Sequence, residues 1–277
     1  MQSISDAMGW VLLFCPGDRP ERFAKAAQAA NIAVLDLEDG VAAAQKDVAR
    51  VSVTVHISAK GADGYAVRIN LPMTERGRAD AEAVANAGVR LLLMPKTESI
   101  EELDLVASAT SCELIATIET ARGLLAVEAI AAHPAVRAVS WGPYDLAADL
   151  GMRGVRDEAG ALLPPLAYAR SRMLVAATAA RKVALDTVTA ELQDPTVIER
   201  DAAESALLGF SGKFAIHPAQ VGPIRRAYRP PEVEVERSRR LLAAIDGRGV
   251  FLFEGEMVDE PMIKRARAIV ALAQRQD

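Results

Sequence analysis

The chain has 277 residues and a net charge of −5, and 51% of its residues are hydrophobic. That length and apolar content suffice for one substantial core, and the acidic charge disfavours nucleic acid as a partner. The N-terminus lacks a basic region followed by a long apolar stretch, and no run of about eighteen apolar residues occurs. We therefore expect a cytoplasmic protein that has no membrane partner.

Short apolar runs rich in β-branched residues alternate with longer segments rich in alanine and charge. This alternation is typical of parallel strands joined by helices, and eight such units predict an α/β protein with a (β/α)8 TIM barrel. The predicted strands are Trp10–Cys15, Ala33–Leu37, Tyr65–Asn70, Arg90–Pro95, Glu113–Ile118, Ala138–Gly142, Val183–Thr187 and Lys213–His217. The predicted helices are Pro20–Ala30, Thr74–Ala87, Ser99–Ala109, Ala121–Ala132, Leu166–Arg181 and Pro195–Leu208, the last capped by Asp194.

The pattern changes near residue 229, where we expect the barrel domain (1–229) to end. Pro230-Pro231 introduces an amphipathic helix over about 232–245, the phrase GVFLFEGEMV predicts a hairpin, and a last helix begins at Pro261. We predict that this helical and hairpin segment (230–277) is a lid or an oligomer contact, because such inserts gate active sites built on rigid scaffolds.

Carboxylates follow several predicted strands at the point where each strand ends. The second strand runs into Asp36, Glu38 and Asp39, the fifth runs into Glu119, and Asp145 follows the sixth. In a barrel the carboxyl ends of the strands form the face that holds the site. Glu119 and Asp145 should project into one crevice from adjacent strands. Such a pair suits Mg²⁺, which prefers oxygen ligands and keeps waters and substrate oxygens in its shell.

Other charged residues also fall at predicted strand ends. Arg68 lies near the end of the third strand, Lys96 follows the fourth, Asp186 lies in the seventh and His217 ends the eighth. For Asp36, Lys96 and Asp186, two interpretations stay open: a role in the site, or an internal salt bridge that closes the barrel mouth. For His217, structural hydrogen bonding is favoured over catalysis.

Two phrases predict contacts with a ligand. CPGDRPERFAKA places Arg19, Arg22 and Lys25 at the start of the first helix, where basic residues oppose the helix dipole, so their clustering favours an external phosphate or a solvated face. SWGPYDL, with Gly142 and Pro143, predicts a tight strand-to-helix turn and backbone groups that face the ligand.

The sequence has few cysteines and histidines, the residues that bind transition metals. Cys15 and Cys112 are the two cysteines, and both lie within or beside apolar runs, so we expect buried thiols rather than a disulfide framework or a zinc cluster. The three histidines are scattered, which makes a histidine-rich transition-metal centre an unfavoured interpretation.

Eight phrases together resemble one known family across nearly the full chain. They are LFCPGDRPERFAKA, VLDLEDGVA, VRIN, MPKTES, IETARG, WGPYDL, AIHPAQ and FEGEMVD. Their order resembles the citrate lyase β-subunit-like branch of the HpcH/HpaI aldolase superfamily, which also holds malyl-CoA and citramalyl-CoA lyases. The resemblance implies a Mg²⁺-dependent barrel enzyme, a homotrimer or a dimer of trimers, that makes or breaks a carbon–carbon bond beside a CoA thioester.

The resemblance also implies roles for single residues. Glu119 of IETARG and Asp145 of WGPYDL match the metal ligands, and Arg68 of VRIN matches the substrate-binding arginine. Asp259 of FEGEMVD matches an acid/base residue that reaches a neighbouring subunit's site in relatives. The chain departs from the commonest pattern at Pro143-Tyr144, where many relatives have a small residue and an acidic one, and in a short segment before the third strand.

The predicted reaction is a reversible cleavage of a 3-hydroxyacyl-CoA, such as citramalyl-CoA or malyl-CoA, into an acyl-CoA and pyruvate, glyoxylate or oxaloacetate. Mg²⁺ on Glu119 and Asp145 would act as a Lewis acid, and Arg68 would stabilise negative charge on the reacting oxygens. Glu38 and Asp39 would hold metal-bound waters or pair with Arg68, and Asp259 would transfer the proton. Arg19, Arg22 and Lys25 are the CoA-binding candidates; Arg68, Glu119, Gly142 and Pro143 are the candidates for substrate contact.

Three alternatives stay open from the sequence. The chain could act on free 2-oxo acids without CoA, although the FEGEMVD tail fits a long ligand clamped between subunits. It could be the β subunit of a citrate lyase complex, in which the thioester is attached to an acyl carrier protein. A non-catalytic scaffold is least favoured, because every chemically demanding position is filled.

Overall fold

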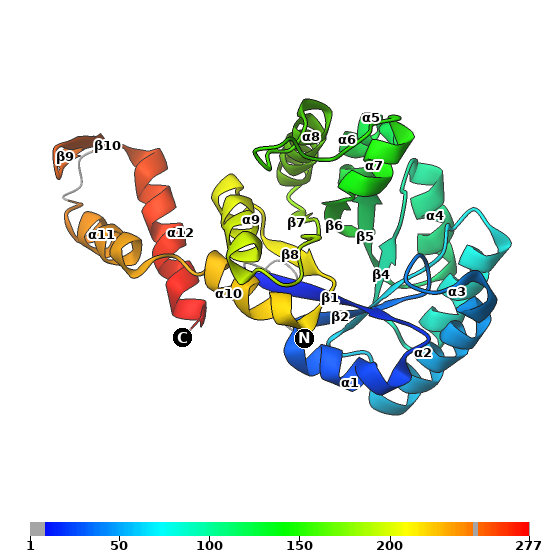
Figure 1. Cartoon of the computed structure of the whole chain (residues 1–277). Helices are drawn as coiled ribbons and strands as arrows, with labels where there is room; N and C mark the ends of the chain where they lie inside the picture. Colours follow the sequence, from blue (N-terminus) through cyan, green and yellow to red (C-terminus); the bar gives the residue numbers. More distant parts are fainter. Residues whose placement is uncertain (1–8, 246–248, 277) are drawn as a thin grey trace.

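The computed structural model describes residues 9–245 and 249–276. Eight parallel strands pair in chain order and close into a barrel, as predicted (Figure 1). The strands are β1 (Trp10–Pro16), β2 (Ile32–Asp36), β3 (Tyr65–Arg68), β4 (Leu91–Met94), β5 (Glu113–Ile118), β6 (Val136–Trp141), β7 (Val183–Asp186) and β8 (Gly212–Ala215). The pairing of β1 with both β2 and β8 completes the closure.

Helices follow the strands and surround the barrel. They are α1 (Pro20–Ala29), α2 (Lys46–Lys60), α3 (Glu75–Asn86), α4 (Ile100–Ala109), α5 (Ala121–Leu125), α6 (Val127–Ala132), α7 (Pro143–Asp149), α8 (Pro164–Ala179), α9 (Pro195–Leu208) and α10 (Val221–Tyr228). Asp194 caps α9 by accepting from the N–H of Thr196, which confirms the predicted cap. The ring of His217 accepts from the N–H of Ala219 and caps a short 3₁₀ turn, which is the predicted structural role.

Two crossover segments differ from the predicted pattern. Helix α2 was not predicted, because its VSVTVH run is β-branched; its buried Ala49, Val53 and Ile57 lie at helical spacing and pack into the core. The predicted helix Ala121–Ala132 is two helices, α5 and α6, that meet at Ala126, where φ is −99° and ψ is 3°. In α2, packing against the barrel overrides local propensity.

Apolar side chains fill two layers of the barrel domain. The larger core lies between the strands and the surrounding helices, and both cysteines are buried there as free thiols, as predicted. The smaller core fills the barrel interior, where Phe14 and Phe214 stack with their ring centroids 5.2 Å apart. These packed interiors make the strand ends a rigid platform for polar side chains.

A network of buried charges ties β7 and β8 to α8 and α9. Asp186 accepts from Arg170 at 2.6 Å and lies 3.7 Å from the Nζ of Lys213, which lies 2.9 Å from Asp201. Burial alone would raise the pKa of Asp186, but Lys213 and Arg170 outweigh it and lower that pKa. Of the two interpretations left open for Asp186, the structure supports the internal salt bridge.

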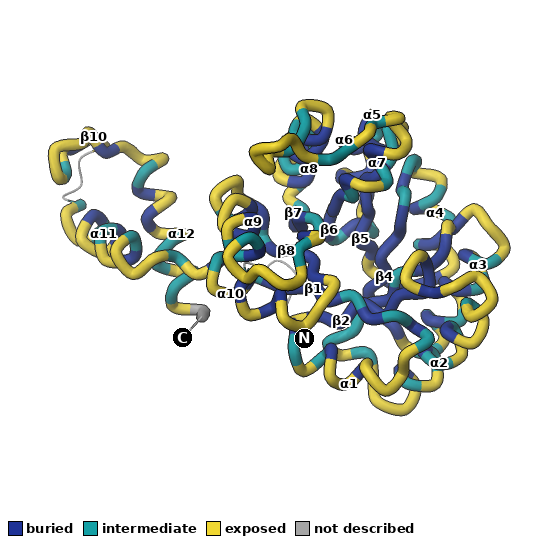
Figure 2. Tube along the Cα trace, viewed as in Figure 1, coloured by how far each residue is buried: buried dark blue, intermediate teal, exposed yellow. Residues whose placement is uncertain are grey.

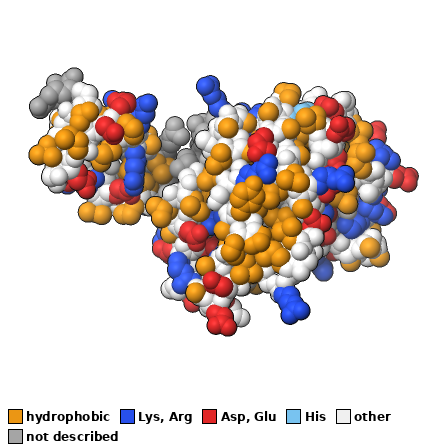
Figure 3. Space-filling model, turned by 90° about the horizontal axis from the view of Figure 1, so that it is seen from above, with side chains coloured by type: hydrophobic (Ala, Val, Ile, Leu, Met, Phe, Trp, Pro, Cys, Tyr) orange, Lys and Arg blue, Asp and Glu red, His pale blue; other side chains and the backbone are white. Residues whose placement is uncertain are grey.

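The described residues beyond 229 form an arm beside the barrel. Helix α11 (Glu232–Ala243), the antiparallel hairpin β9 (Phe251–Phe253) and β10 (Glu256–Val258), and helix α12 (Glu260–Gln276) follow one another. They have a small core of their own around Leu241, Phe251 and Val258. The arm stands away from the barrel, and buried and exposed residues alternate along it (Figures 1 and 2). From above it is a separate lobe (Figure 3).

Within the described ranges, no helix has both the length and the apolar character needed to cross a membrane.

Candidate active site

A cavity of about 410 Å³ opens at the carboxyl ends of the barrel strands. Its described lining residues lie between positions 14 and 216, so the described part of the C-terminal arm contributes none of them. The lining combines apolar rings with carboxylates and hydroxyls, an arrangement suited to a small polar ligand. The polar and charged lining residues, with the glycine discussed below, are Asp36, Asp39, Arg68, Thr117, Glu119, Ser140, Gly142, Tyr144, Asp145 and Thr187.

Arg68, at the end of β3, is held by two carboxylates. Its Nε donates to Asp36 Oδ1 at 2.7 Å, and its Nη2 donates to Asp36 Oδ2 at 2.5 Å. Its Nη1 lies 3.0 Å from Glu38 Oε2, and its guanidinium carbon lies 4.8 Å from the centroid of the Phe14 ring. This clamp orients the planar guanidinium at the cavity wall. Of the two interpretations that the sequence left open for Asp36, the structure supports the internal salt bridge, whose partner is Arg68.

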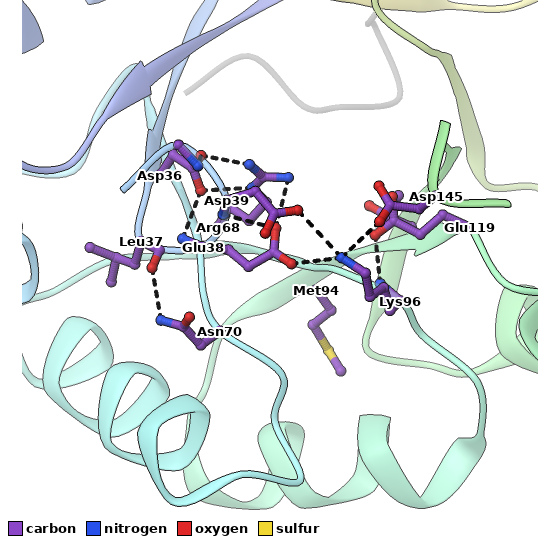
Figure 4. Close-up of polar contacts among 12 residues, drawn as sticks. Asp36, Leu37, Glu38, Asp39, Arg68, Asn70, Met94, Lys96, Glu119 and Asp145 are labelled. Carbon is purple, nitrogen blue, oxygen red and sulfur yellow. Dashed lines mark hydrogen bonds and ion pairs between the residues drawn. The ribbon is translucent and has the colours of Figure 1, made fainter. Parts of the chain in front are cut away.

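Lys96 connects the acidic residues of two sides of the cavity (Figure 4). Its Nζ lies 2.9 Å from Glu38 Oε1, 3.4 Å from Asp39 Oδ2 and 3.1 Å from Asp145 Oδ1. Burial lowers the pKa of this ammonium, but the hydrogen bond to Glu38 leads the interactions that raise it overall. Lys96 thus remains charged and forms ion pairs with three predicted site residues, Glu38, Asp39 and Asp145.

Glu119 is the most deeply buried acid of the cavity lining after Asp36, at 5% exposure. It directly follows β5, and its Oε1 accepts from the N–H of Lys96 at 2.8 Å. Lys96 has a φ of 45°, in the left-handed region that residues other than glycine seldom occupy. Burial raises the pKa of the Glu119 carboxyl to about 7, and the charge of Asp145 adds to the increase. A cation beside Glu119 would offset both effects.

Asp145 faces Glu119 from the first turn of α7 (Figure 4). Gly142 precedes that helix, and its N–H donates to Ile118 O, so the end of β6 lies directly against the end of β5. Within the described part of the chain, no group of three or more His, Cys, Asp or Glu side chains is arranged to hold a metal. Mg²⁺ commonly uses one or two carboxylates and completes its shell with waters and substrate, so Glu119 and Asp145 fit that ion.

The close approach of the two strand ends requires glycine at position 142. A Cβ there would overlap Glu119 Oε2 and lie 3.0 Å from Glu119 Cβ. Gly142→Ala is therefore expected to displace the Glu119 carboxylate and to weaken Mg²⁺ binding by about tenfold or more. Isothermal titration with Mg²⁺ measures the loss. Gly222→Ala is the control, because a Cβ there meets only the end of the Arg226 side chain at 3.6 Å. Equal Mg²⁺ affinity in both variants would contradict this packing account.

The three CoA candidates lie outside the cavity lining. Arg19 precedes α1 and lies 3.8 Å from Asp18, while Arg22 lies 3.7 Å from Glu21. Both side chains are more than half exposed, and Lys25 is exposed as well. The cluster therefore sits on the surface beside the end of β1, next to the cavity residue Pro16.

Asp259 lies far along the chain from these groups, on the arm. It follows β10, and its Oδ1 accepts from the N–H of Met262 at 3.4 Å at the start of α12. The structure thus brings together Glu38, Asp39, Arg68, Glu119 and Asp145, but it leaves Asp259 of the same chain outside the cavity.

Several lining residues were not predicted from the sequence. Thr117 and Ser140 hydrogen-bond to each other at 2.9 Å on adjacent strands, and Phe14 packs under Arg68. Hydroxyls near the carboxyl ends of otherwise apolar strands are the signal that could have identified Thr117 and Ser140. Tyr144 also lines the cavity, directly after the predicted Pro143.

A closed parallel barrel with two acids and a clamped arginine at its mouth defines a metal-dependent enzyme of TIM-barrel type. The model of the HpcH/HpaI aldolase/citrate lyase family matches residues 11–218. The chain belongs to this family, which confirms the resemblance and, at the level of the family, the predicted lyase class.

Individual relatives match over almost the whole chain. A citrate lyase subunit beta-like protein of Mycobacterium tuberculosis is 40% identical, over 96% of this chain and 95% of its own. A mitochondrial citramalyl-CoA lyase of Rattus norvegicus is 32% identical, over 95% of this chain and 85% of its own. The crystal structure of protein CitE from M. tuberculosis, in complex with magnesium, acetoacetate and coenzyme A, has a TM-score of 0.90 at 39% identity and covers 97% of this chain and 99% of that one.

Proposed function

We propose that this protein is a Mg²⁺-dependent lyase that cleaves, or forms, a short 3-hydroxyacyl-CoA such as citramalyl-CoA or malyl-CoA. The products of cleavage are an acyl-CoA and a 2-oxo acid: pyruvate, glyoxylate or oxaloacetate. The observation that carries the proposal is the pairing of Glu119 with Asp145 opposite the clamped Arg68 in one cavity. The CoA and magnesium in the related crystal structure, and the name of the rat relative, support the choice of substrate class.

The reaction requires stabilisation of negative charge on oxygen. Breaking the carbon–carbon bond removes a proton from the hydroxyl, turns its carbon into the oxo group and leaves an enolate that must gain a proton on carbon. Mg²⁺ held by Glu119 and Asp145 would supply Lewis acidity towards the substrate oxygens. Arg68 adds a fixed positive charge, whose orientation by Asp36 and Glu38 costs no rearrangement during the reaction.

Lys96 and its three acidic partners, Glu38, Asp39 and Asp145, organise the site. Glu38 contacts both Arg68 and Lys96, so it couples the two cations at a fixed separation. Asp39 lines the cavity with a side chain that is 63% exposed, and its Oδ2 lies 3.4 Å from Lys96 Nζ, so part of the carboxylate remains accessible to water. We therefore assign Glu38 to orienting Arg68, and Asp39 to binding water beside the ligand.

The planar, bidentate geometry of the Arg68 guanidinium predicts that lysine cannot replace it. Arg68→Lys would lose the two parallel bonds to Asp36 and the planar contact with the substrate oxygens. We expect kcat/KM to fall about tenfold or more, which is about 1.4 kcal/mol of transition-state stabilisation. Steady-state kinetics of both proteins measure this fall in kcat/KM. Arg50→Lys is a matched control, because Arg50 pairs with Asp80 away from the cavity. Unchanged kinetics in Arg68→Lys would limit Arg68 to a structural salt bridge.

The exposed cations near α1 suit the phosphates of CoA. Arg19, Arg22 and Lys25 are on the surface beside the barrel mouth, and a long ligand could extend from the cavity across this surface. An acyl-CoA with its thioester in the cavity and its phosphates on the Arg19, Arg22 and Lys25 cluster would occupy both the cavity and this basic surface.

We further propose that Asp259 acts in the site of a neighbouring subunit of a homotrimer or hexamer. The arm extends away from its own barrel, and none of its described residues lines its own cavity. Its exposed Leu252 and Met257 are 70% and 65% accessible, which suits burial against another copy. The arm would then cover the neighbouring cavity and bring Asp259 to the carbon that gains a proton.

A substrate panel tests the proposed function. Purified protein with Mg²⁺ is assayed against malyl-CoA, citramalyl-CoA, citryl-CoA and hydroxymethylglutaryl-CoA, with coupled detection of the 2-oxo acid or ketone product. Cleavage of at least one thioester is expected. Failure on all four, with activity on the same acyl groups attached to an acyl carrier protein, would instead support the citrate lyase subunit role.

A further inference from the structure

A second cavity, of about 180 Å³, lies at the opposite end of the barrel. Its walls come from the first residues of β5, β6 and β7 and the turns before them, whereas Glu119 and Asp145 follow the other ends of β5 and β6. The proposed reaction does not use this cavity. Its lining residues are Cys112, Glu113, Pro134, Ala135, Val136, Arg137, Arg181, Lys182 and Val183.

A β-bulge places Arg137 in this cavity. Leu114 of β5 pairs with Val136, but the next residue, Ile115, pairs with Ala138, so Arg137 is an extra residue in β6. Bulges change the direction of a side chain and are common next to functional sites. The Nε of Arg137 lies 3.6 Å from Glu113 Oε1, and about a third of the side chain is exposed.

The turn between α8 and β7 supplies two more cations. Arg181 has a φ of 57°, in the left-handed region, and its N–H donates to Thr178 O while that of Lys182 donates to Ala177 O. Glycine or asparagine usually occupies the left-handed residue after a helix, so arginine is an uncommon choice there. The strained backbone keeps Arg181 and Lys182 side by side at the cavity wall.

Cations outnumber carboxylates among the described residues of the cavity wall. Among the described residues of this lining, Arg137, Arg181 and Lys182 carry positive charge and Glu113 carries negative charge, whereas the whole chain has a net charge of −5. Burial lowers the pKa of Lys182, and the charge of Arg137 lowers it further. An added anion would relieve the repulsion between these cations and would accept charge-assisted hydrogen bonds from them.

We propose that this cavity is a binding site for a small oxyanion of the phosphate class, held by Arg137, Arg181 and Lys182. The volume accommodates one phosphate group, and the bulge and the left-handed turn direct the cations to the same space. The ligand is inorganic phosphate or the phosphate of a small monoester. The site does not depend on the lyase reaction, because it shares no residue with the first cavity.

Calorimetric titration of the full chain with inorganic phosphate, in low salt without Mg²⁺, tests this site. The triple variant Arg19→Ala, Arg22→Ala, Lys25→Ala serves as the background, because it removes the other exposed basic cluster. One phosphate should bind per chain, and Arg137→Gln and Lys182→Gln should each weaken it about tenfold. A parallel titration with glycerol phosphate distinguishes free phosphate from a monoester by which one binds tighter.

Arg225→Gln is the matched control, since Arg225 is an exposed arginine of α10 outside the cavity. It should leave phosphate binding unchanged. Because Arg137→Gln could disturb the bulge, Lys182→Gln, in a turn, gives an independent result, and circular dichroism verifies the fold of both. No binding at millimolar phosphate, or equal affinity in Lys182→Gln and Arg225→Gln, would overturn the proposal.

Discussion

Replacing Glu119 with glutamine is expected to lower kcat at least about a thousandfold and to abolish Mg²⁺ binding. Glutamine keeps the size of the side chain, so the packing against Gly142 and a hydrogen bond from Lys96 can persist. The variant loses the charge that, with Asp145, would hold the ion. The effect should therefore be specific to the metal and should leave the fold intact.

Thermal unfolding distinguishes a loss of metal binding from a loss of fold stability in Glu119→Gln. Burial disfavours the charged form of Glu119, so the metal-free Glu119→Gln protein should be at least as stable as the metal-free parent. The parent should gain stability on adding Mg²⁺, and the variant should not. Glu158→Gln is the control, because Glu158 is exposed and outside the cavity. Substantial turnover by Glu119→Gln with Mg²⁺ would contradict the assignment of the metal site.

Asp259→Ala is expected to lose most activity while keeping Mg²⁺ binding, because the residue lies on the arm and not beside Glu119 and Asp145. Mixing inactive Asp259→Ala with inactive Glu119→Gln under subunit-exchange conditions should restore part of the activity. Some mixed interfaces would then pair an intact barrel with an intact arm.

Mass spectrometry of the mixed oligomers provides the control for this experiment. If mixed oligomers form and remain inactive, Asp259 does not act between subunits. Full activity of Asp259→Ala alone would remove the proton-transfer role. Glu260→Ala is the matched arm variant, because Glu260 is the exposed neighbour of Asp259 at the start of α12, and it should remain active.

The position of the acids could be predicted because strand ends can be recognised from the sequence. Apolar runs that end in Asp36, Glu38 and Glu119 predict that these carboxylates meet at one face of a barrel, and the structure places all three there. The contacts among them could not be predicted. The bridge from Lys96 to Glu38 and Asp145 depends on a positive φ and on the spacing of separate strands, which local sequence does not encode.

Other features depend on packing that has no local signal. The β-branched run of α2 has strand propensity, and it is helical because Val53 and Ile57 are buried against the barrel. The extra residue at Arg137 becomes visible only when β6 is paired with β5. The mouth of the barrel was therefore more predictable than its opposite end.

The most direct test of Mg²⁺-dependent carbon–carbon cleavage is the product stoichiometry for the best thioester of the panel, measured by mass spectrometry with Mg²⁺ and with EDTA. With Mg²⁺, each substrate consumed should yield one acyl-CoA and one 2-oxo acid or ketone product, and EDTA should stop both. Release of free CoA without the second product, or full turnover in EDTA, would contradict the proposed function.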